Sequence, residues 1–144
     1  MRYLEAVDVS DRIVDEIWER VSKAGSYYSI ADGITKGNFR RMLFESSILY
    51  RAPSLVVRLN FTPEYVEIHP IAFGPSVFKH AREALSEIVE LRDRLFSDKP
   101  ICAIIPDGMR GAKRLAKVAG MTEEARYVRA LSGVAIPCTV FTWR

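Results

Sequence analysis

The segment 101–105 constrains the fold of this chain more than any other. It reads Ile-Cys-Ala-Ile-Ile, without a polar side chain, and it follows a long helical pattern that opens at Gly74-Pro75-Ser76 and ends at Ser97-Asp98-Lys99-Pro100. A short apolar run of this kind predicts a strand buried on both faces, which is typical of parallel pairing. The helix before it supplies the long crossover that parallel strands need. Its predicted buried side consists of Val77, Ala81, Ala84, Leu85, Ile88 and Leu95.

Three shorter strand patterns precede this unit. Residues 48–52 form a brief apolar run that stops at Pro53, and residues 55–61 alternate apolar and polar side chains. After a turn at 62–64, residues 65–73 give a further strand. Short strands separated by turns predict an antiparallel meander.

The N-terminal part predicts a strand near residues 3–7 followed by a helix. Asp8 or Ser10 is the candidate N-cap, because either side chain can accept a hydrogen bond from a free backbone amide. Gly25 is the expected end of the helix. The apolar stripe between them consists of Ile13, Val14, Ile17, Trp18 and Val21. A turn-rich stretch at 26–37 could form a wall over a site or a plain connection to a short helix near 39–43.

The C-terminal part predicts one more helix and a hairpin. Ala112, Leu115, Ala116 and Ala119 mark the buried side of the helix, and Gly120 ends it. Two strand patterns follow at 126–131 and 135–143, joined at Ser132-Gly133. The predicted order is therefore β-α-α-β-β-β-α-β-α-β-β.

Composition bounds the class of protein. The chain has 144 residues, 49% apolar and 27% charged, which fits one soluble globular domain over residues 1–144. A net charge of +3 favours an anionic small ligand or a weakly acidic partner over nucleic acid, which would require a dense basic stripe. Without a run of eighteen apolar residues or an apolar signal core, we expect no membrane span and a cytoplasmic location.

Cysteine and histidine usage indicates neither a disulfide framework nor a metal site. Cys102 and Cys138 lie in apolar runs, which favours buried, reduced thiols over a disulfide. The chain has only two histidines, and neither lies near a cysteine in the sequence. We therefore expect no bound metal.

Three stretches resemble the GNAT (N-acetyltransferase) superfamily. VEIHPIAFG at 66–74 resembles its fourth strand and the loop that opens onto the cofactor, and ICAIIPDGMRGAKRLAKVAGM at 101–121 its following strand and helix. EEARYVRALSGVAIPCTVFTWR at 123–144 resembles its closing hairpin. With the element order, the resemblance covers nearly the whole chain and implies an α/β fold, a mixed, mostly antiparallel central sheet with helices on both faces. A narrower resemblance is to small GNAT-like proteins encoded by bacteriophages.

The resemblance implies an acyl-CoA-dependent N-acetyltransferase that uses acetyl-CoA and an amine acceptor. Glu67 and His69 share one face of their strand by its period of two, and either one, through a water molecule, is the candidate general base. The alternative is that both are ordinary solvent-facing residues of the strand. The pantetheine would lie along the backbone of Ile71, Ala72 and Phe73. The pyrophosphate of CoA would bind at Gly74, Ser76 and Val77, where amides at a helix N-terminus favour an anion.

The sequence also departs from the family pattern. The cofactor loop of the family usually has Arg or Gln, two further residues, Gly, one residue, and then Gly or Ala. In this sequence Phe73 stands in place of the Arg or Gln, and Ser76 and Phe78 stand in place of the two small residues. On the next helix, Met109 and Ala116 stand where the family often has Asn and Tyr. Its basic residues Arg110, Lys113, Arg114 and Lys117 suit a solvated face or contact with a CoA phosphate.

These departures leave two functions open. One is an N-acetyltransferase-like enzyme with a degenerate cofactor loop, acting on an unidentified amine. The other is a non-catalytic GNAT-fold protein of a phage particle or its assembly, with a second copy or a virion protein as its partner. The expected location for the first is the cytoplasm, which is that of the host if the chain is phage-encoded, and for the second the virion.

Overall fold

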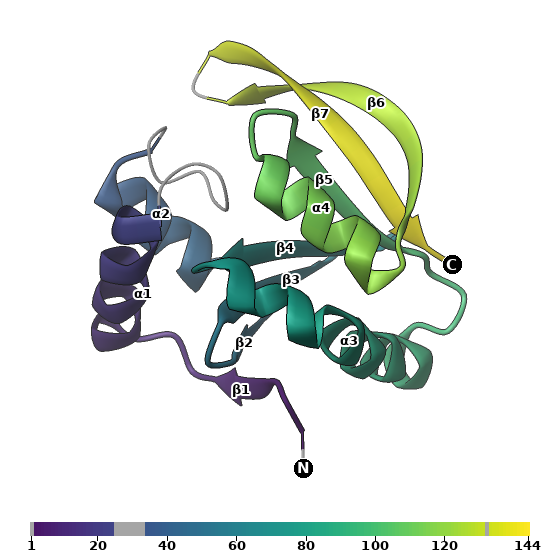
Figure 1. Cartoon of the computed structure of the whole chain (residues 1–144), viewed down its shortest axis with the longest axis horizontal. Helices are drawn as coiled ribbons and strands as arrows, with labels where there is room; N and C mark the ends of the chain where they lie inside the picture. The colour runs from purple at the N-terminus through teal and green to yellow at the C-terminus, as the bar shows by residue number, and fades with distance from the viewer. Residues whose placement is uncertain (1, 25–33, 132) are drawn as a thin grey trace.

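A computed structural model describes residues 2–24, 34–131 and 133–144 (Figure 1). Seven strands form one mixed sheet in the order β1-β2-β3-β4-β5-β7-β6. Among the described strands, β4 and β5 pair in parallel and all other neighbours are antiparallel. The elements are β1 Glu5–Val7, α1 Asp11–Ala24, α2 Lys36–Phe44, β2 Ile48–Arg51, β3 Leu55–Phe61, β4 Val66–Ala72, η2 Pro75–His80, α3 Ala81–Leu95, β5 Ile101–Pro106, α4 Arg110–Ala119, β6 Thr122–Leu131 and β7 Val134–Trp143.

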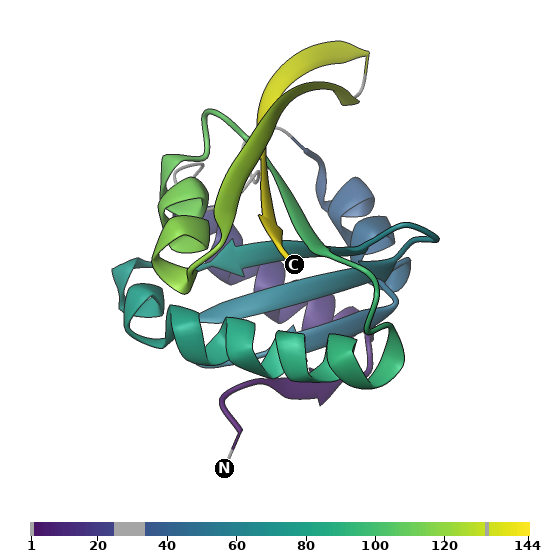
Figure 2. The same cartoon turned by 90° about the vertical axis from the view of Figure 1, so that its right-hand side faces the viewer.

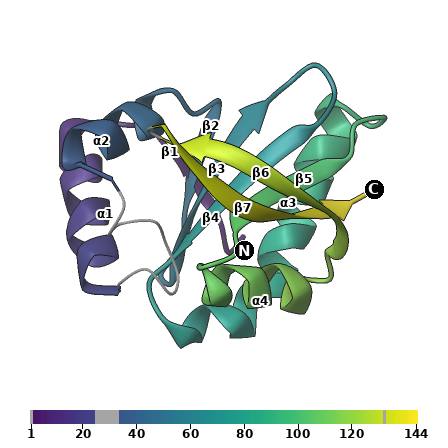
Figure 3. The ribbon, with the colours of Figure 1, turned by 90° about the horizontal axis from the view of Figure 1, so that it is seen from above.

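The predicted α/β class, the mixed sheet and the element order are confirmed. Helices α1 and α2 cover one face of the sheet, and α3 and α4 cover the other (Figures 2 and 3). Each face has its own apolar cluster. Leu49, Val56 and Ile71 of the sheet pack with α1 and α2, whereas the alternate residues of β3, such as Val57 and Leu59, pack on the side of α3 and α4.

Helix ends agree with the predicted caps where the structure describes them. The Ser10 hydroxyl accepts a hydrogen bond from the Ile13 amide at 3.3 Å, so Ser10 and not Asp8 caps α1. Gly120 ends α4 with φ of +105°, a left-handed conformation that glycine adopts without strain. The other predicted stop, Gly25, lies outside the described residues, as does most of the 26–37 stretch.

The long helix predicted after Gly74 is two elements. Residues 75–80 form the 3-10 helix η2, and the α-helix α3 begins only at Ala81. The Val77 amide donates to the Gly74 carbonyl three residues before it, at 3.4 Å, and no side chain caps this turn. Pro75 has no amide hydrogen to contribute. The first turn therefore winds in the tighter i to i+3 pattern.

The buried stripe of α3 differs from the prediction at its C-terminal end. Leu95 is 51% exposed, so its predicted burial is wrong, and Arg92 is only 6% exposed. The Arg92 guanidinium donates to the Lys99 carbonyl at 2.6 Å and to Asp93 at 2.8 Å. Phe96 packs on the core from beyond the helix. An arginine can occupy a core position when its donors are paired in this way.

Strands β4 and β5 separate after a short parallel contact. They pair only at Val66 with Ile101 and at Glu67 with Cys102, although β5 continues along β7 to Pro106. The two strands are therefore splayed beyond Glu67 and Cys102. Val66 donates to the Pro100 carbonyl at 2.9 Å, so even-numbered residues of β4 turn their backbone groups toward β5. Pro70 is one of them, and because it has no amide hydrogen it cannot extend the ladder.

Both cysteines are free and buried, as predicted. Cys102 stands opposite Thr142 in the β5–β7 ladder and Cys138 opposite Pro106, so the two thiols are four positions apart along it and do not adjoin. Among the residues that the structure describes, no helix is long and apolar enough to cross a membrane.

Candidate functional site

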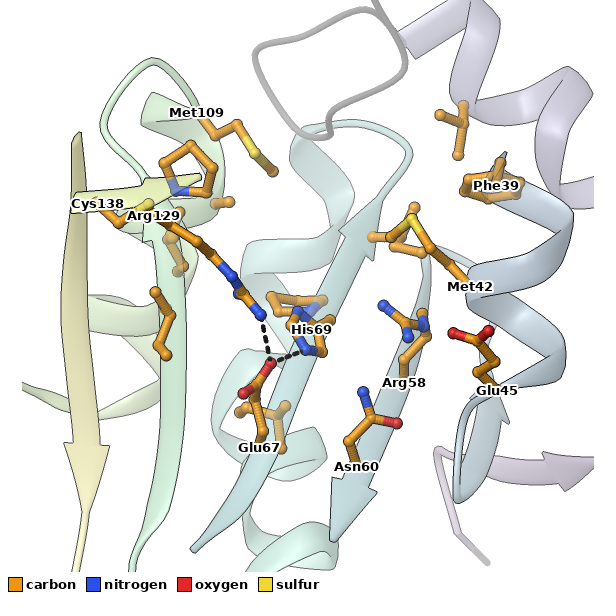
Figure 4. A pocket seen from close by; sticks show the side chains of 18 residues that line it. Phe39, Met42, Glu45, Arg58, Asn60, Glu67, His69, Met109, Arg129 and Cys138 are labelled. Atoms are coloured by element: carbon orange, nitrogen blue, oxygen red, sulfur yellow. Dashed lines mark ion pairs between the residues drawn. The ribbon is translucent and has the colours of Figure 1, made fainter. Parts of the chain in front are cut away.

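A cavity of about 330 Å³ opens where β4 and β5 separate (Figure 4). Its walls come from α1 and α2 on one side and from β5, the start of α4 and the β6–β7 hairpin on the other. The floor is made by β3 and β4. A cavity at a splay in an open sheet is a common place for a ligand.

Four polar side chains stand together on this floor. Arg58 lies opposite His69 and Asn60 opposite Glu67 in the antiparallel β3–β4 ladder. Directly opposed residues, and residues two apart on one strand, share a face of the sheet. Arg58, Asn60, Glu67 and His69, the polar tetrad below, therefore face the cavity together, and all four line it.

Glu67 is a buried and fully engaged carboxylate, 6% exposed. One oxygen accepts a hydrogen bond from His69 Nε2 and lies 3.7 Å from Arg129 Nη2, and the other accepts from the Tyr65 hydroxyl at 3.4 Å. The hydrogen bond from His69 lowers the pKa of Glu67, with further lowering from the charge of Arg129, and these effects outweigh burial, which alone would raise it. Glu67 is thus ionised at neutral pH.

His69 has one ring nitrogen committed and one available. Nε2 faces Glu67, and no described residue bonds to Nδ1. The side chain is 21% exposed and lines the cavity. When a carboxylate accepts a hydrogen bond from one imidazole nitrogen, the proton is on that nitrogen and the lone pair is on the other. The second nitrogen can then act as a general base, and the carboxylate fixes the orientation of the ring. The structure therefore brings together the two residues that the sequence analysis proposed as alternatives for the base.

Arg58 and Asn60 carry unsatisfied polar groups into the same cavity. Arg58 is 5% exposed, and its Nε donates to the Ser46 hydroxyl at 2.9 Å. Burial lowers the pKa of its guanidinium, although the charges of Glu67 and Glu45 oppose this effect. Asn60 Oδ1 is buried and has no hydrogen-bond partner among the described residues. A buried polar atom left in this way is costly unless a ligand or water satisfies it.

The predicted pantetheine strand is only partly available. The Phe73 amide donates to the Ser54 carbonyl at 3.2 Å, and Ile71 pairs with Val56, so the odd-numbered positions of β4 turn toward β3. The amide and carbonyl of Ala72 and the carbonyl of Pro70 are instead directed to the other edge of β4, where β4 and β5 have separated. The free edge of β4 thus offers one donor and two acceptors to an extended ligand.

The predicted pyrophosphate loop is open at its first residue. A side-chain carbon added at Gly74 would meet no atom within 4 Å. Ser76 is exposed, but the side chain of Val77 is fully buried in the core. The Phe78 ring packs against that core, and the guanidinium of Arg114 lies 4.7 Å from its centroid. A cation from α4 therefore stands beside this loop.

Helix α4 contributes little chemistry to the cavity. Met109 and Ala112 line it, whereas Ala116, at the place of the family's tyrosine, is buried in the core under α3 and α4. Lys113 pairs with Asp107 at 3.2 Å, and Asp107 also accepts from the Thr139 hydroxyl at 2.7 Å. These contacts hold the start of α4 to the hairpin.

Four polar residues of the cavity were missed by the sequence analysis: Glu45, Arg58, Asn60 and Arg129. Arg58 and Asn60 are the polar members of the alternation in 55–61, so their type was visible but their pairing with Glu67 and His69 was not. Arg129 comes from the edge strand β6, two strands beyond β5 in the sheet order. No local pattern places it beside Glu67.

The fold is that of solved acetyltransferases. No family model and no curated protein matches the sequence. An acetyltransferase of the GNAT family from Bacillus anthracis superimposes with a TM-score of 0.69 at 14% identity, over 99% of this chain and 95% of that one. RimL, a ribosomal L7/L12 α-N-protein acetyltransferase in complex with coenzyme A, gives 0.67 at 12%, over 99% and 94%. The microcin C7 self-immunity acetyltransferase MccE, in complex with acetyl-CoA and AMP, gives 0.67 at 10%, over 98% and 92%.

These likenesses establish the GNAT acetyltransferase fold for this chain. At such identities they concern the fold alone, and function has to be argued from the site.

Proposed function

We propose that the protein is an acyl-CoA-dependent N-acyltransferase whose active site is the cavity between β4 and β5. The observation that carries the proposal is the pair formed by the buried Glu67 and the partly buried His69, which faces that cavity with one imidazole nitrogen free. An ammonium must lose a proton before its nitrogen can attack a carbonyl. A histidine held by an ionised carboxylate is suited to take that proton.

The residues divide the work as follows. His69 Nδ1 accepts the proton from the acceptor amine, and Glu67 stabilises the imidazolium that results and fixes the orientation of its ring. Arg129 and Tyr65 keep the Glu67 carboxylate ionised and in place. Acetyl-CoA would supply a thioester carbonyl: the amine nitrogen forms the new C–N bond, and the C–S bond breaks. The second proton that the nitrogen loses as it becomes an amide passes through water to the leaving thiolate, and His69 returns its own proton to solvent.

The free edge of β4 fits the cofactor better than the loop does. The Ala72 amide and carbonyl and the Pro70 carbonyl suit the amide groups of a pantetheine laid along the strand. Gly74, Ser76 and Val77 would receive the pyrophosphate at the open end, with Arg114 as a nearby cation. Only the backbone of Val77 is suitable, because its side chain is buried.

A second candidate is a GNAT-fold protein that no longer binds CoA and acts through protein contacts. The six-residue 3-10 helix and the non-glycine residues Ser76 and Phe78 favour it, because a short turn with side chains gives a phosphate fewer aligned amides. A role in a phage particle would be one form of this function. It rests only on the sequence resemblance, since the solved structures named above give it no support.

Thermal unfolding with and without acetyl-CoA separates the two candidates. A ligand that binds only the native state raises the melting temperature, and saturation at 100 times Kd adds about 2.7 kcal/mol of stability. We expect a rise with millimolar acetyl-CoA, and release of the CoA thiol when a panel of amines is added. His69→Gln should abolish thiol release and keep the thermal shift. Absence of both signals in the natural protein would favour the second candidate.

A further inference from the structure

We propose that the acceptor is a small amino acid with a free ammonium, a free carboxylate and an apolar side chain, and that its carboxylate binds Arg58. This inference rests on the proposed transferase function and names the substrate class of the same cavity. The products would be the N-acylated amino acid and the CoA thiol.

Arg58 is a fixed, buried cation with donors to spare. Its Nε donates to the Ser46 hydroxyl at 2.9 Å, and that hydroxyl donates in turn to the Met42 carbonyl at 3.1 Å, so α2 holds the guanidinium in place. Its two terminal amino groups form no hydrogen bond or ion pair with the described residues, and the side chain lines the cavity (Figure 4). Such a fork is suited to bind a carboxylate through two parallel hydrogen bonds.

Neither of the two described carboxylates that line the cavity, Glu67 and Glu45, serves as this partner. Glu67 is engaged by His69, Tyr65 and Arg129. Glu45, the C-cap residue after α2, is exposed and forms no ion pair with Arg58. A buried cation without a paired anion is destabilising, so a protein that keeps one in a cavity gains when a ligand brings the anion.

Two further members of the polar tetrad, Asn60 and His69, are suited to bind an ammonium. Asn60 Oδ1 is a buried acceptor without a partner, and His69 Nδ1 is the proposed base. Arg58 and Asn60 are two positions apart on β3, each opposite one member of the Glu67–His69 pair. The Cβ atoms of directly opposed residues in a sheet lie about 4.5–5.5 Å apart. Such a short separation suits a ligand whose ammonium and carboxylate are on the same carbon.

The charges and the apolar wall of the cavity narrow the class of acceptor further. The charged residues that line the cavity are Arg58, Arg129, Glu45 and Glu67, two of each sign, so the lining is neutral when His69 is neutral. A zwitterion adds no net charge to it. Val21, Phe39 and Met42 form the α1–α2 wall, which favours an apolar side chain on the acceptor. A polyamine brings only cations, and a peptide N-terminus has no carboxylate at this distance.

The test compares leucine with leucinamide, which differs in having no carboxylate. Thiol release from acetyl-CoA by the natural protein should give leucine a kcat/KM at least about tenfold above that of leucinamide, because hydrogen bonds to a charged group are strong and an unfilled Arg58 fork loses them. This comparison needs no variant. Arg58→Gln should bring the ratio close to one, whereas the exposed Arg41→Gln of α2 should keep it.

The outcomes separate the inference from the function on which it rests. Equal or better turnover of leucinamide, spermidine or a peptide N-terminus would overturn the amino-acid assignment and leave the transferase standing. An unchanged preference for leucine in folded Arg58→Gln would also overturn it. If no amine releases thiol and neither acetyl-CoA nor leucine raises the melting temperature, the transferase function fails and the inference fails with it.

Discussion

The substitution Glu67→Gln tests the centre of the proposed site, because it removes a charge and nearly keeps the shape. In the natural protein the carboxylate accepts hydrogen bonds from His69 and Tyr65 and lies 3.7 Å from Arg129. Glutamine offers one acceptor oxygen and puts an amide group where the second oxygen was. At least one of these contacts is therefore lost, and the charge of Arg129 is left without its partner.

The expected loss of stability follows from these contacts. A hydrogen bond to a charged group contributes about 1.5–3 kcal/mol. The Arg129 side chain is 37% exposed, so water screens its ion pair and the contribution is at most about 1 kcal/mol. Glutamine keeps one of the hydrogen bonds. We therefore expect the free energy of unfolding to fall by about 1–3 kcal/mol at pH 7.

The pH dependence of this loss has a definite sign. Because the pKa of Glu67 is lowered in the folded protein, its contribution is complete above the unfolded pKa of about 4.3 and is lost as the pH falls through the folded value. The difference between natural protein and Glu67→Gln should thus be largest at pH 7 and shrink below about pH 4. Urea unfolding followed by tryptophan fluorescence measures it, and a gap that stays constant from pH 7 to pH 3 would refute the reasoning.

Activity should respond more strongly than stability. General acid–base catalysis contributes about 10²–10⁴-fold, so kcat/KM for Glu67→Gln should fall by that order. Glu64→Gln is the matched control: it makes the same change at an exposed position in the turn before β4 and should be neutral in both assays. If kcat/KM of Glu67→Gln stays within threefold of the natural value, Glu67 does not orient the base.

Three further predictions concern other parts of the molecule. Because Cys102 and Cys138 are buried and free, titration of the denatured, unreduced protein should find two thiols, and a count of zero would mean a disulfide. The natural protein should bind acetyl-CoA at high micromolar affinity or weaker, and Ser76→Gly should tighten binding; calorimetry giving a submicromolar Kd for the natural protein would contradict the weight placed on the missing glycines. Gly120→Ala, at φ of +105°, should lower the free energy of unfolding in urea by about 1–2 kcal/mol, and an effect no larger than that of Gly108→Ala, where no clash occurs, would contradict this.

Much of the architecture follows from local patterns in the sequence. The apolar run 101–105 after a long helix predicts the parallel strand β5, and the period of two in 65–73 puts Glu67 and His69 on one face. Ser10 and Gly120 cap their helices as their chemistry requires. These features depend on neighbours within a few residues, so the sequence alone is sufficient for them.

Helix details depended on packing. Two features depend on the residues packed against each segment: the 3-10 turn at 75–80, and the burial of Arg92 in place of the predicted Leu95. Arg92 is buried because the Lys99 carbonyl and the Asp93 carboxylate are in reach of its donors. Such partners cannot be read from a hydrophobic stripe.

The assembly of the two halves of the polar tetrad, Arg58–Asn60 on β3 and Glu67–His69 on β4, was decided by tertiary structure. Alternation showed Arg58 and Asn60 to be the polar residues of β3, but their meeting with His69 and Glu67 depends on the register of the β3–β4 ladder. Arg129 reaches Glu67 from a strand that is distant in the chain. A strand's own period determines which side chains share its face, whereas register and strand order are determined by which apolar surfaces pack together, and these involve the whole chain.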